Sequence, residues 1–232
     1  MGLTRPTWVF GDDFEFPPPA RASRDGVVAL GGEVTPRTLR RAYQAGIFPW
    51  PVREDLPMFW FSPNPRFLLE LDRLHISRSL AKILRRDPPE IRFDTAFPEV
   101  LLRCARARRD GGGTWIDSRI VRGFVHLHTE AAQDNVRVHS VEAWRGDTLV
   151  GGLYGVQAGA AFAGESMFFI EPDAGKVALV ALVERLRARG FHFLDCQVET
   201  ENLGRFGARN VPREEFLARL ADARLESVTL TG

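Results

Sequence analysis

The chain has 232 residues, of which 44% are hydrophobic and 26% charged, an ordinary composition for one large globular domain or two unequal ones. Its 31 basic residues nearly balance its 30 acidic ones, which excludes a strongly basic nucleic-acid coat and an acidic disordered tail. Two cysteines exclude a disulfide framework, and the longest apolar run, residues 177–183, is far shorter than the roughly 18 residues of a membrane span. These properties predict a cytoplasmic protein with no membrane partner.

The N-terminal part is expected to hold one short helix. Residues 1–30 are rich in proline and aromatic side chains, which predicts an irregular arm. Thr35 is a suitable N-cap, Pro36 suits the first helical position and Gly46 suits a C-terminal cap. These signals predict a helix over residues 36–45.

A change in composition at about residue 65 predicts a domain boundary. Prolines and aromatic side chains are dense in residues 47–51 and 58–66, which excludes a helix in either segment. Beyond them, helical and strand patterns alternate. We therefore expect a small N-terminal domain over residues 1–64 and a larger domain over residues 65–232.

The larger domain has the order of an α+β fold. Its predicted helices span residues 77–86, 95–108, 118–132, 175–189 and 212–221, and its predicted strands span residues 136–144, 148–157, 160–169 and 191–198. Asp117 is a suitable N-cap, as is either Asp94 or Thr95. Antiparallel strands are followed by a helix, a buried strand and a last helix, which predicts an α+β class.

Two strands carry polar residues that packing alone does not explain. Glu165 is expected to share a strand face with Met167, where a carboxylate is costly unless it has a partner; the alternative is a solvated face of the sheet. Asp195 and Gln197 are expected on one face of a buried strand. A buried carboxylate there favours a functional role.

Tryptophans and arginines suggest a nucleic-acid contact. Trp50 and Trp60 lie in proline-rich loops and, with Trp115, suit a stacking surface, although tryptophans are also common in cores. Residues 73–122 hold twelve basic and six acidic residues. Arginine suits phosphate, so this stretch suits a polyanion; the alternative is a solvated helix face.

Other chemistries lack their motifs. The chain has no cysteine and histidine cluster with zinc spacing, so no metal site is predicted. It has no Walker loop and no G-x-G-x-x-G, and Ser166 lacks the following glycine of a nucleophile elbow. Metal and covalent nucleophilic mechanisms are therefore not expected.

Nine blocks in order resemble the bacterial leucyl/phenylalanyl-tRNA–protein transferases. They are Leu30-Gly-Gly-Glu33, Gly46-Ile-Phe-Pro-Trp50, Trp60-Phe-Ser-Pro-Asn-Pro-Arg66, His75-Ile-Ser-Arg-Ser79, Gly113-Thr-Trp-Ile116, His139-Ser-Val-Glu142, Gly151-Gly-Leu-Tyr-Gly155, Gly164-Glu-Ser-Met-Phe168 and Asp195-Cys-Gln197. The resemblance runs from about residue 28 to residue 220. One block would mean little, but nine in order are specific.

The resemblance implies a fold, a reaction and its partners. The family moves leucine or phenylalanine, and also methionine, from a charged tRNA to the N-terminal arginine or lysine of a protein and so marks it for degradation by the N-end rule. The implied fold is a small N-terminal domain on a larger GNAT-like acyltransferase domain. No cofactor is implied, because the aminoacyl ester is already activated. Nothing in the sequence demands more than a monomer.

The resemblance also assigns residues to roles. The catalytic positions are Asp195, Gln197 and Glu165, with Asp195 orienting Gln197 and Glu165 attracting the cationic N-terminus of the acceptor. The substrate-binding positions are Trp50, Trp115, Leu153, Phe162, Met167, Leu179, Leu182 and Leu194; the two tryptophans stack on the terminal adenine. The arginine-rich stretch supplies tRNA-binding positions, and Lys176 joins them at a helix N-terminus. These positions are Arg78, Lys82, Arg85, Arg86 and Lys176.

Several positions depart from the family pattern, and two alternatives stay open. The departures are Phe169, Ile170, Gly175, Asn202 and Arg205. A coenzyme-A-dependent acetyltransferase of the same fold is one alternative, although the pyrophosphate-binding spacing is missing from residues 169–176. A tRNA-binding protein without catalysis is the other. Transfer of an amino acid to a peptide distinguishes all three.

Overall fold

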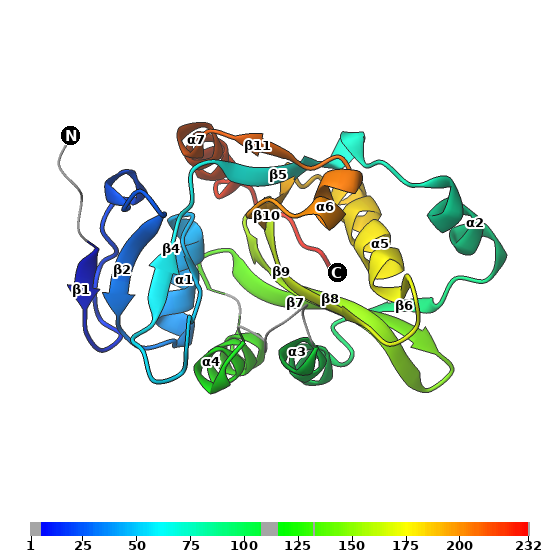
Figure 1. Cartoon of the computed structure of the whole chain (residues 1–232), viewed down its shortest axis with the longest axis horizontal. Helices are drawn as coiled ribbons and strands as arrows, with labels where there is room; N and C mark the ends of the chain where they lie inside the picture. Colours follow the sequence, from blue (N-terminus) through cyan, green and yellow to red (C-terminus); the bar gives the residue numbers. More distant parts are fainter. Residues whose placement is uncertain (1–5, 108–115, 132, 232) are drawn as a thin grey trace.

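The computed structural model describes residues 6–107, 116–131 and 133–231, and these ranges form two sheets with helices around them (Figure 1). The smaller sheet has the order β1-β2-β4-β3. Its strands are β1 (Thr7–Val9), β2 (Val27–Gly31), β3 (Phe48–Pro49) and β4 (Phe59–Phe61). The prediction of an irregular arm before residue 30 is therefore wrong in part, because β1 and β2 pair there in parallel.

Helix α1 (Pro36–Gln44) packs beside this small sheet, and its prediction is confirmed. The Thr35 hydroxyl accepts a hydrogen bond from the Thr38 backbone N–H, and Pro36 occupies the first turn. Gly46 follows the helix with φ of 71°, a conformation that favours glycine. Such capping signals act between residues that are close in the sequence, which explains why the sequence predicted this helix correctly.

The larger sheet has the order β11-β5-β10-β9-β8-β7-β6. Its strands are β5 (Arg66–Glu70), β6 (Glu90–Phe93), β7 (Val136–Arg145), β8 (Thr148–Ala158), β9 (Ala161–Phe169), β10 (Phe193–Gln197) and β11 (Arg209–Val211). Neighbouring strands are antiparallel except for β9 and β10, which are parallel. Strands β7 to β10 were predicted, whereas β5, β6 and β11 were not.

Helices cover both faces of the larger sheet. They are α2 (Arg78–Arg86), α3 (Phe97–Arg106), α4 (Ser118–Thr129), α5 (Ala174–Ala188), α6 (Glu201–Arg205) and α7 (Arg213–Ala223), with short 3₁₀ turns η1 (Pro19–Arg21) and η2 (Leu71–Arg73). A side chain at Gly151 would meet Ala174 of α5, and one at Gly152 would come close to Val100 of α3. Since adjacent strand residues face opposite ways, α5 and α3 lie on opposite faces.

The start of α3 differs from its prediction. The helix begins at Phe97, and neither Asp94 nor Thr95 caps it. Instead, the buried Glu142 carboxylate on β7 accepts hydrogen bonds from the backbone N–H groups of Thr95 and Ala96. A cap supplied from another element has no local sequence signal. Asp117, by contrast, caps α4 as predicted.

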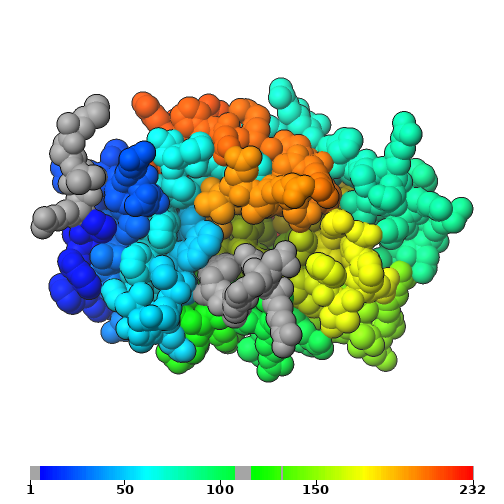
Figure 2. Space-filling model, in the orientation of Figure 1, coloured from blue at the N-terminus to red at the C-terminus, as the bar shows by residue number. Residues whose placement is uncertain are grey.

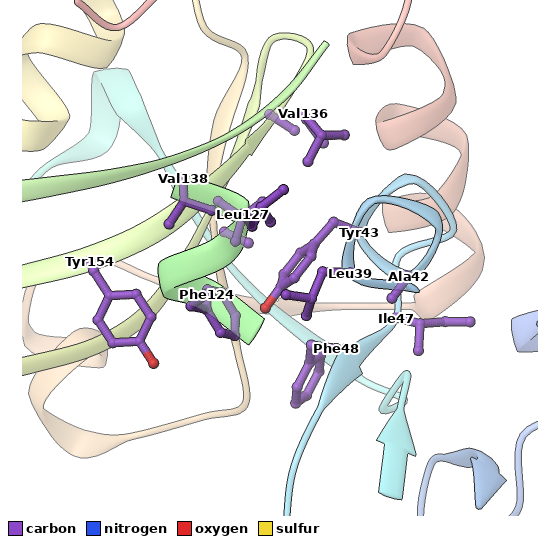
Figure 3. Close-up of a cluster of buried hydrophobic side chains, with 14 of the residues drawn as sticks. Leu39, Ala42, Tyr43, Ile47, Phe48, Phe124, Leu127, Val136, Val138 and Tyr154 are labelled. Carbon is purple, nitrogen blue, oxygen red and sulfur yellow. The ribbon is translucent and has the colours of Figure 1, made fainter. Parts of the chain in front are cut away.

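A hydrophobic cluster joins α1 to the larger sheet (Figure 3). The ring of Tyr43 lies 6.3 Å from that of Phe124 on α4, which lies 5.5 Å from that of Tyr154 on β8. These contacts hold the N-terminal elements against the sheet. The α+β class, with a small N-terminal part and a large mixed sheet flanked by helices, is confirmed. Among the described residues, no helix is long and apolar enough to cross a membrane.

Candidate active site

A pocket of about 260 Å³ opens where β9 and β10 stop pairing. Their pairing ends at Ala163 and Asp195, so the residues that follow reach into the space between the strands. Figure 2 shows this face hollowed between residues near 50 in cyan, α5 in yellow and residues near 200 in orange. The predicted site residues that line the pocket are Trp50, Leu153, Glu165, Met167, Leu179, Leu182, Leu194 and Gln197.

Two strand irregularities bring the polar residues of the pocket together. On β9, Glu165 is the extra residue of a bulge, because Tyr154 pairs with Ser166 and the next residue of β8 pairs with Gly164. On β10, Cys196 is skipped in the same way, and Gln197 adopts φ of 64°. Bulges redirect side chains. As a result, Gln197 Nε2 donates a hydrogen bond of 2.5 Å to Glu165 Oε1.

Burial controls the charge of Glu165. Desolvation of the carboxylate raises the pKa of Glu165 to about 8. Its Oε2 atom makes no well-formed hydrogen bond with any described residue, and the nearby Tyr43 hydroxyl offsets only part of the rise. Glu165 is therefore mostly neutral at pH 7. The electrostatic attraction expected of it requires that it lose its proton first.

Asp195 lies behind the pocket wall and not in it. Its side chain lines a second, much smaller cavity of about 10 Å³ together with Tyr43 and Arg66. The expectation that Asp195 and Gln197 share one strand face is wrong, because the irregularity between them breaks the alternation. Alternation also fails on β9, where residues 164–167 all line the pocket.

Asp195 has two partners that its sequence position did not suggest. Its Oδ1 and Oδ2 atoms accept hydrogen bonds of 2.8 and 2.6 Å from the Arg66 guanidinium. Oδ1 also accepts a hydrogen bond of 2.9 Å from the backbone N–H of Gln197. Asp195 therefore orients Gln197 through the backbone, and the Gln197 side chain is held by Glu165.

The apolar wall contains most of the predicted residues. Phe162 is the exception, since it is fully buried in the core with its ring 6.3 Å from that of His139 and does not line the pocket. Sequence reasoning missed the lining residues Tyr154, Ser166, Thr200, Asn202 and Leu203. Asn202 carried one signal, because it departs from the family pattern at a position that now lies at the pocket.

The tryptophans have different positions. Trp50 lines the pocket, with its ring 6.1 Å from that of Phe61. Trp60 is fully buried and its indole N–H donates to Gly31 O, so the prediction that it belongs to a stacking surface is wrong. Trp115 lies outside the described residues.

The predicted tRNA-binding residues lie on two helices. Arg78, Lys82, Arg85 and Arg86 are exposed on α2. None of these four forms a salt bridge with another described residue. Lys176 lies in the first turn of α5, where its ammonium pairs with Asp173 at 2.6 Å. In the described part of the chain, no three histidine, cysteine, aspartate or glutamate side chains are grouped as metal ligands.

The family models and the sequence relatives agree on one family. The model of leucyl/phenylalanyl-tRNA protein transferase matches residues 68–221, and the model of its N-terminal domain matches residues 32–64. The leucyl/phenylalanyl-tRNA–protein transferase of Myxococcus xanthus is 50% identical over 224 residues, covering 95% of this chain and 93% of the relative. That of Anaeromyxobacter dehalogenans is 53% identical over 218 residues, covering 94% and 91%.

Among solved structures, a conserved protein of unknown function from Staphylococcus epidermidis matches with a TM-score of 0.44 and 9% identity, over 80% of this chain and 68% of that one. The family assignment depends on the sequence relatives and the family models. Together, the two family models cover all the residues that line the pocket. The chain belongs to the leucyl/phenylalanyl-tRNA–protein transferase family.

Proposed function

We propose that the protein transfers leucine or phenylalanine, with methionine as a further donor, from aminoacyl-tRNA to proteins with N-terminal arginine or lysine. The observation that carries this proposal is a pocket with an apolar wall and one polar corner, formed by Glu165 and Gln197. The wall suits an apolar side chain. The corner suits the amine and the ester that react beside it.

The donor binds along the apolar wall. The wall is formed by leucines from β8, α5 and β10, which are Leu153, Leu179, Leu182 and Leu194. Met167 on β9 adds a flexible side chain that adapts to residues of different shape. Trp50 at the rim stacks on the terminal adenine of the tRNA. The resemblance gives Trp115 the same role.

The reaction needs a neutral amine next to an activated ester. The amine nitrogen attacks the ester carbonyl carbon, the bond to the ribose oxygen breaks, and that oxygen leaves with the proton that the nitrogen loses. Gln197 Nε2 is bound to Glu165, so Gln197 Oε1 is left to accept a hydrogen bond from the attacking amine. An α-amino group has a pKa of about 8, close to that of Glu165. When one proton is shared between the two groups, the pair of ammonium and Glu165 carboxylate is therefore close in energy to the pair of neutral amine and Glu165 carboxylic acid, which makes the attacking amine accessible.

The exposed cations of α2 and Lys176 bind the tRNA backbone. The four α2 cations are exposed and belong to residues 73–122, which hold twelve basic and six acidic residues. Binding of tRNA by such groups releases counterions and weakens as salt rises. A binding constant for leucyl-tRNA that does not change with salt would contradict this role.

The finer description of the fold is also part of the proposal. We assign residues 1–64 to a small N-terminal domain and residues 65–232 to a GNAT-like domain. The change of sheet between Phe61 and Arg66 supports the boundary. The parallel pair β9 and β10, joined by α5, supports the GNAT-like assignment together with the family resemblance.

The test is an aminoacyl-transfer assay. Purified protein is incubated with radiolabelled leucyl-tRNA and peptides that differ only in an N-terminal arginine, lysine, aspartate or methionine. Label on the arginine and lysine peptides alone is the expected result. Label on the aspartate peptide would contradict the acceptor class, and no label from folded protein that binds the tRNA would favour a binding protein. Acetyl transfer from acetyl-coenzyme A would favour the acetyltransferase.

A further inference from the structure

Arg66 is a buried charged residue with no role in the reaction described so far. It is the first residue of β5, and only 1% of its surface is exposed. Its guanidinium lies between two aromatic rings, 4.9 Å from the centre of Phe48 and 4.3 Å from the centre of Phe216. Its Nη1 donates to Gly46 O at 3.3 Å. These contacts therefore fix the position and the orientation of the guanidinium.

The fixed guanidinium determines how Asp195 is oriented. Two of its nitrogens bind both carboxylate oxygens of Asp195, at 2.8 and 2.6 Å. A bidentate pair of this kind allows one orientation of the carboxylate, whereas a lysine ammonium would allow several. With this orientation, Asp195 Oδ1 reaches the backbone N–H of Gln197 at 2.9 Å.

That last hydrogen bond stabilises an unfavourable backbone conformation. Gln197 has φ of 64°, the left-handed region that residues with a side chain rarely adopt. In this conformation its side chain points to Glu165 and lines the pocket. Without Asp195 in place, the backbone would relax and the amide would move, and displacements of about 1 Å at a reacting group reduce rates strongly.

We propose that Arg66 is a positioning residue for the transfer reaction, which holds Gln197 in its reactive orientation through Asp195. This inference rests on the proposed function. Arg66 is placed away from the substrate, since it lines the small cavity behind the pocket wall and is not among the described residues that line the pocket. Its effect is on the rate of the chemical step and not on the affinity for leucyl-tRNA.

The chain offers a matched control for Arg66. Arg219 on α7 also forms a bidentate pair, with Glu70 of β5 at 2.7 and 2.8 Å, and also lies over an aromatic ring, that of Phe193 at 4.8 Å. Within the described ranges, the Glu70 carboxylate bonds to Arg209 and Arg219, and neither of these lines the pocket. Replacing Arg219 by lysine therefore weakens a similar ion pair, between α7 and β5, and leaves the contacts of Gln197 in place.

The experiment compares Arg66→Lys with Arg219→Lys in steady-state transfer of leucine to a peptide with N-terminal arginine, with thermal melting of both variants. We expect Arg66→Lys to lower kcat by about tenfold or more, with KM for leucyl-tRNA changed less than about threefold. Arg219→Lys is expected to keep kcat within about twofold. Equal losses of kcat in Arg66→Lys and Arg219→Lys, or a rise in KM with kcat unchanged, would mean that Arg66 is only structural.

A second variant covers the case in which Arg66→Lys does not fold. Phe216→Leu removes the ring on one side of the guanidinium and leaves the ion pair in place. We expect it to lower kcat about threefold or more with KM unchanged, and an unchanged kcat would overturn the proposal. Wild-type protein that transfers no leucine would instead refute the proposed function. If the wild type transfers leucine and both Arg66→Lys and Phe216→Leu keep a normal kcat, the role of Arg66 is refuted and the proposed function is not.

Discussion

Replacing Glu165 by glutamine should change how the stability of the protein depends on pH. Glutamine has almost the same shape, and its carbonyl oxygen still accepts the hydrogen bond from Gln197 Nε2. The substitution removes only the titration of a buried carboxyl group. Because the pKa of that group is raised, the folded state holds a proton that the unfolded state loses.

The sign and size of the effect follow from the raised pKa. Burial raises the pKa of Glu165 from an ordinary value of 4.5 to about 8. Between these two values the folded state binds more protons than the unfolded state, so stability falls as pH rises. A tenfold change in an equilibrium costs about 1.4 kcal/mol, so from about pH 5 to about pH 9 this group lowers the free energy of unfolding by about 4 kcal/mol.

The assay is chemical denaturation of the wild type and of Glu165→Gln at a series of pH values. Up to about pH 9 the difference between the two proteins isolates Glu165. The raised pKa of the Cys196 thiol is common to both, and the Tyr43 hydroxyl, whose pKa Glu165 also raises, ordinarily ionises only near pH 10. The variant should gain about 4 kcal/mol relative to the wild type between about pH 5 and about pH 9. Two parallel curves would show that Glu165 ionises normally in the folded protein and would refute the reasoning.

Three further predictions follow from the site and the fold. Trp50→Ala should raise KM for leucyl-tRNA about tenfold, since stacking on one base is worth about 1–3 kcal/mol, and Trp50→Phe should restore most of it. Gly175→Ala should lower the free energy of unfolding by about 1–3 kcal/mol, because its Cβ would lie 2.9 Å from Phe168 O. Gly204→Ala should be neutral or stabilising, because its Cβ would make only an ordinary contact of 3.9 Å with the Phe67 ring. A Gly175→Ala protein more stable than the wild type would contradict this packing. Asp117→Ala should cost about 1 kcal/mol in denaturation through loss of the α4 cap, and equal stability would contradict it.

The local structure was largely readable from the chain. Thr35, Pro36 and Gly46 act within a few residues, and strands β7 to β10 show their alternation or apolar runs directly. The short strands were not readable, because three residues of β1 or β11 carry too little pattern. Their pairing depends on partners elsewhere in the chain.

The candidate site was predictable as a set of residues and not as a geometry. Glu165 and Gln197 were singled out because polar groups are rare on apolar strands, and Leu179 and Leu182 because of the resemblance. Phe162, which the resemblance assigns to substrate binding, is buried in the core and is not among the residues that line the pocket. Trp60 was misassigned to a stacking surface, because the residues next to it in the sequence do not indicate what packs on its ring.

The sequence by itself determined the family, the order of the main elements and the chemical types present at the site. These depend on residue identity and on interactions between near neighbours along the chain. Only the tertiary structure decided that Asp195 faces Arg66, 129 residues away, and that two bulges turn Glu165 toward Gln197. Alternation holds only while a strand stays regular. Where a bulge or a long-range contact makes a strand irregular, tertiary packing determines the direction of a side chain and its pKa.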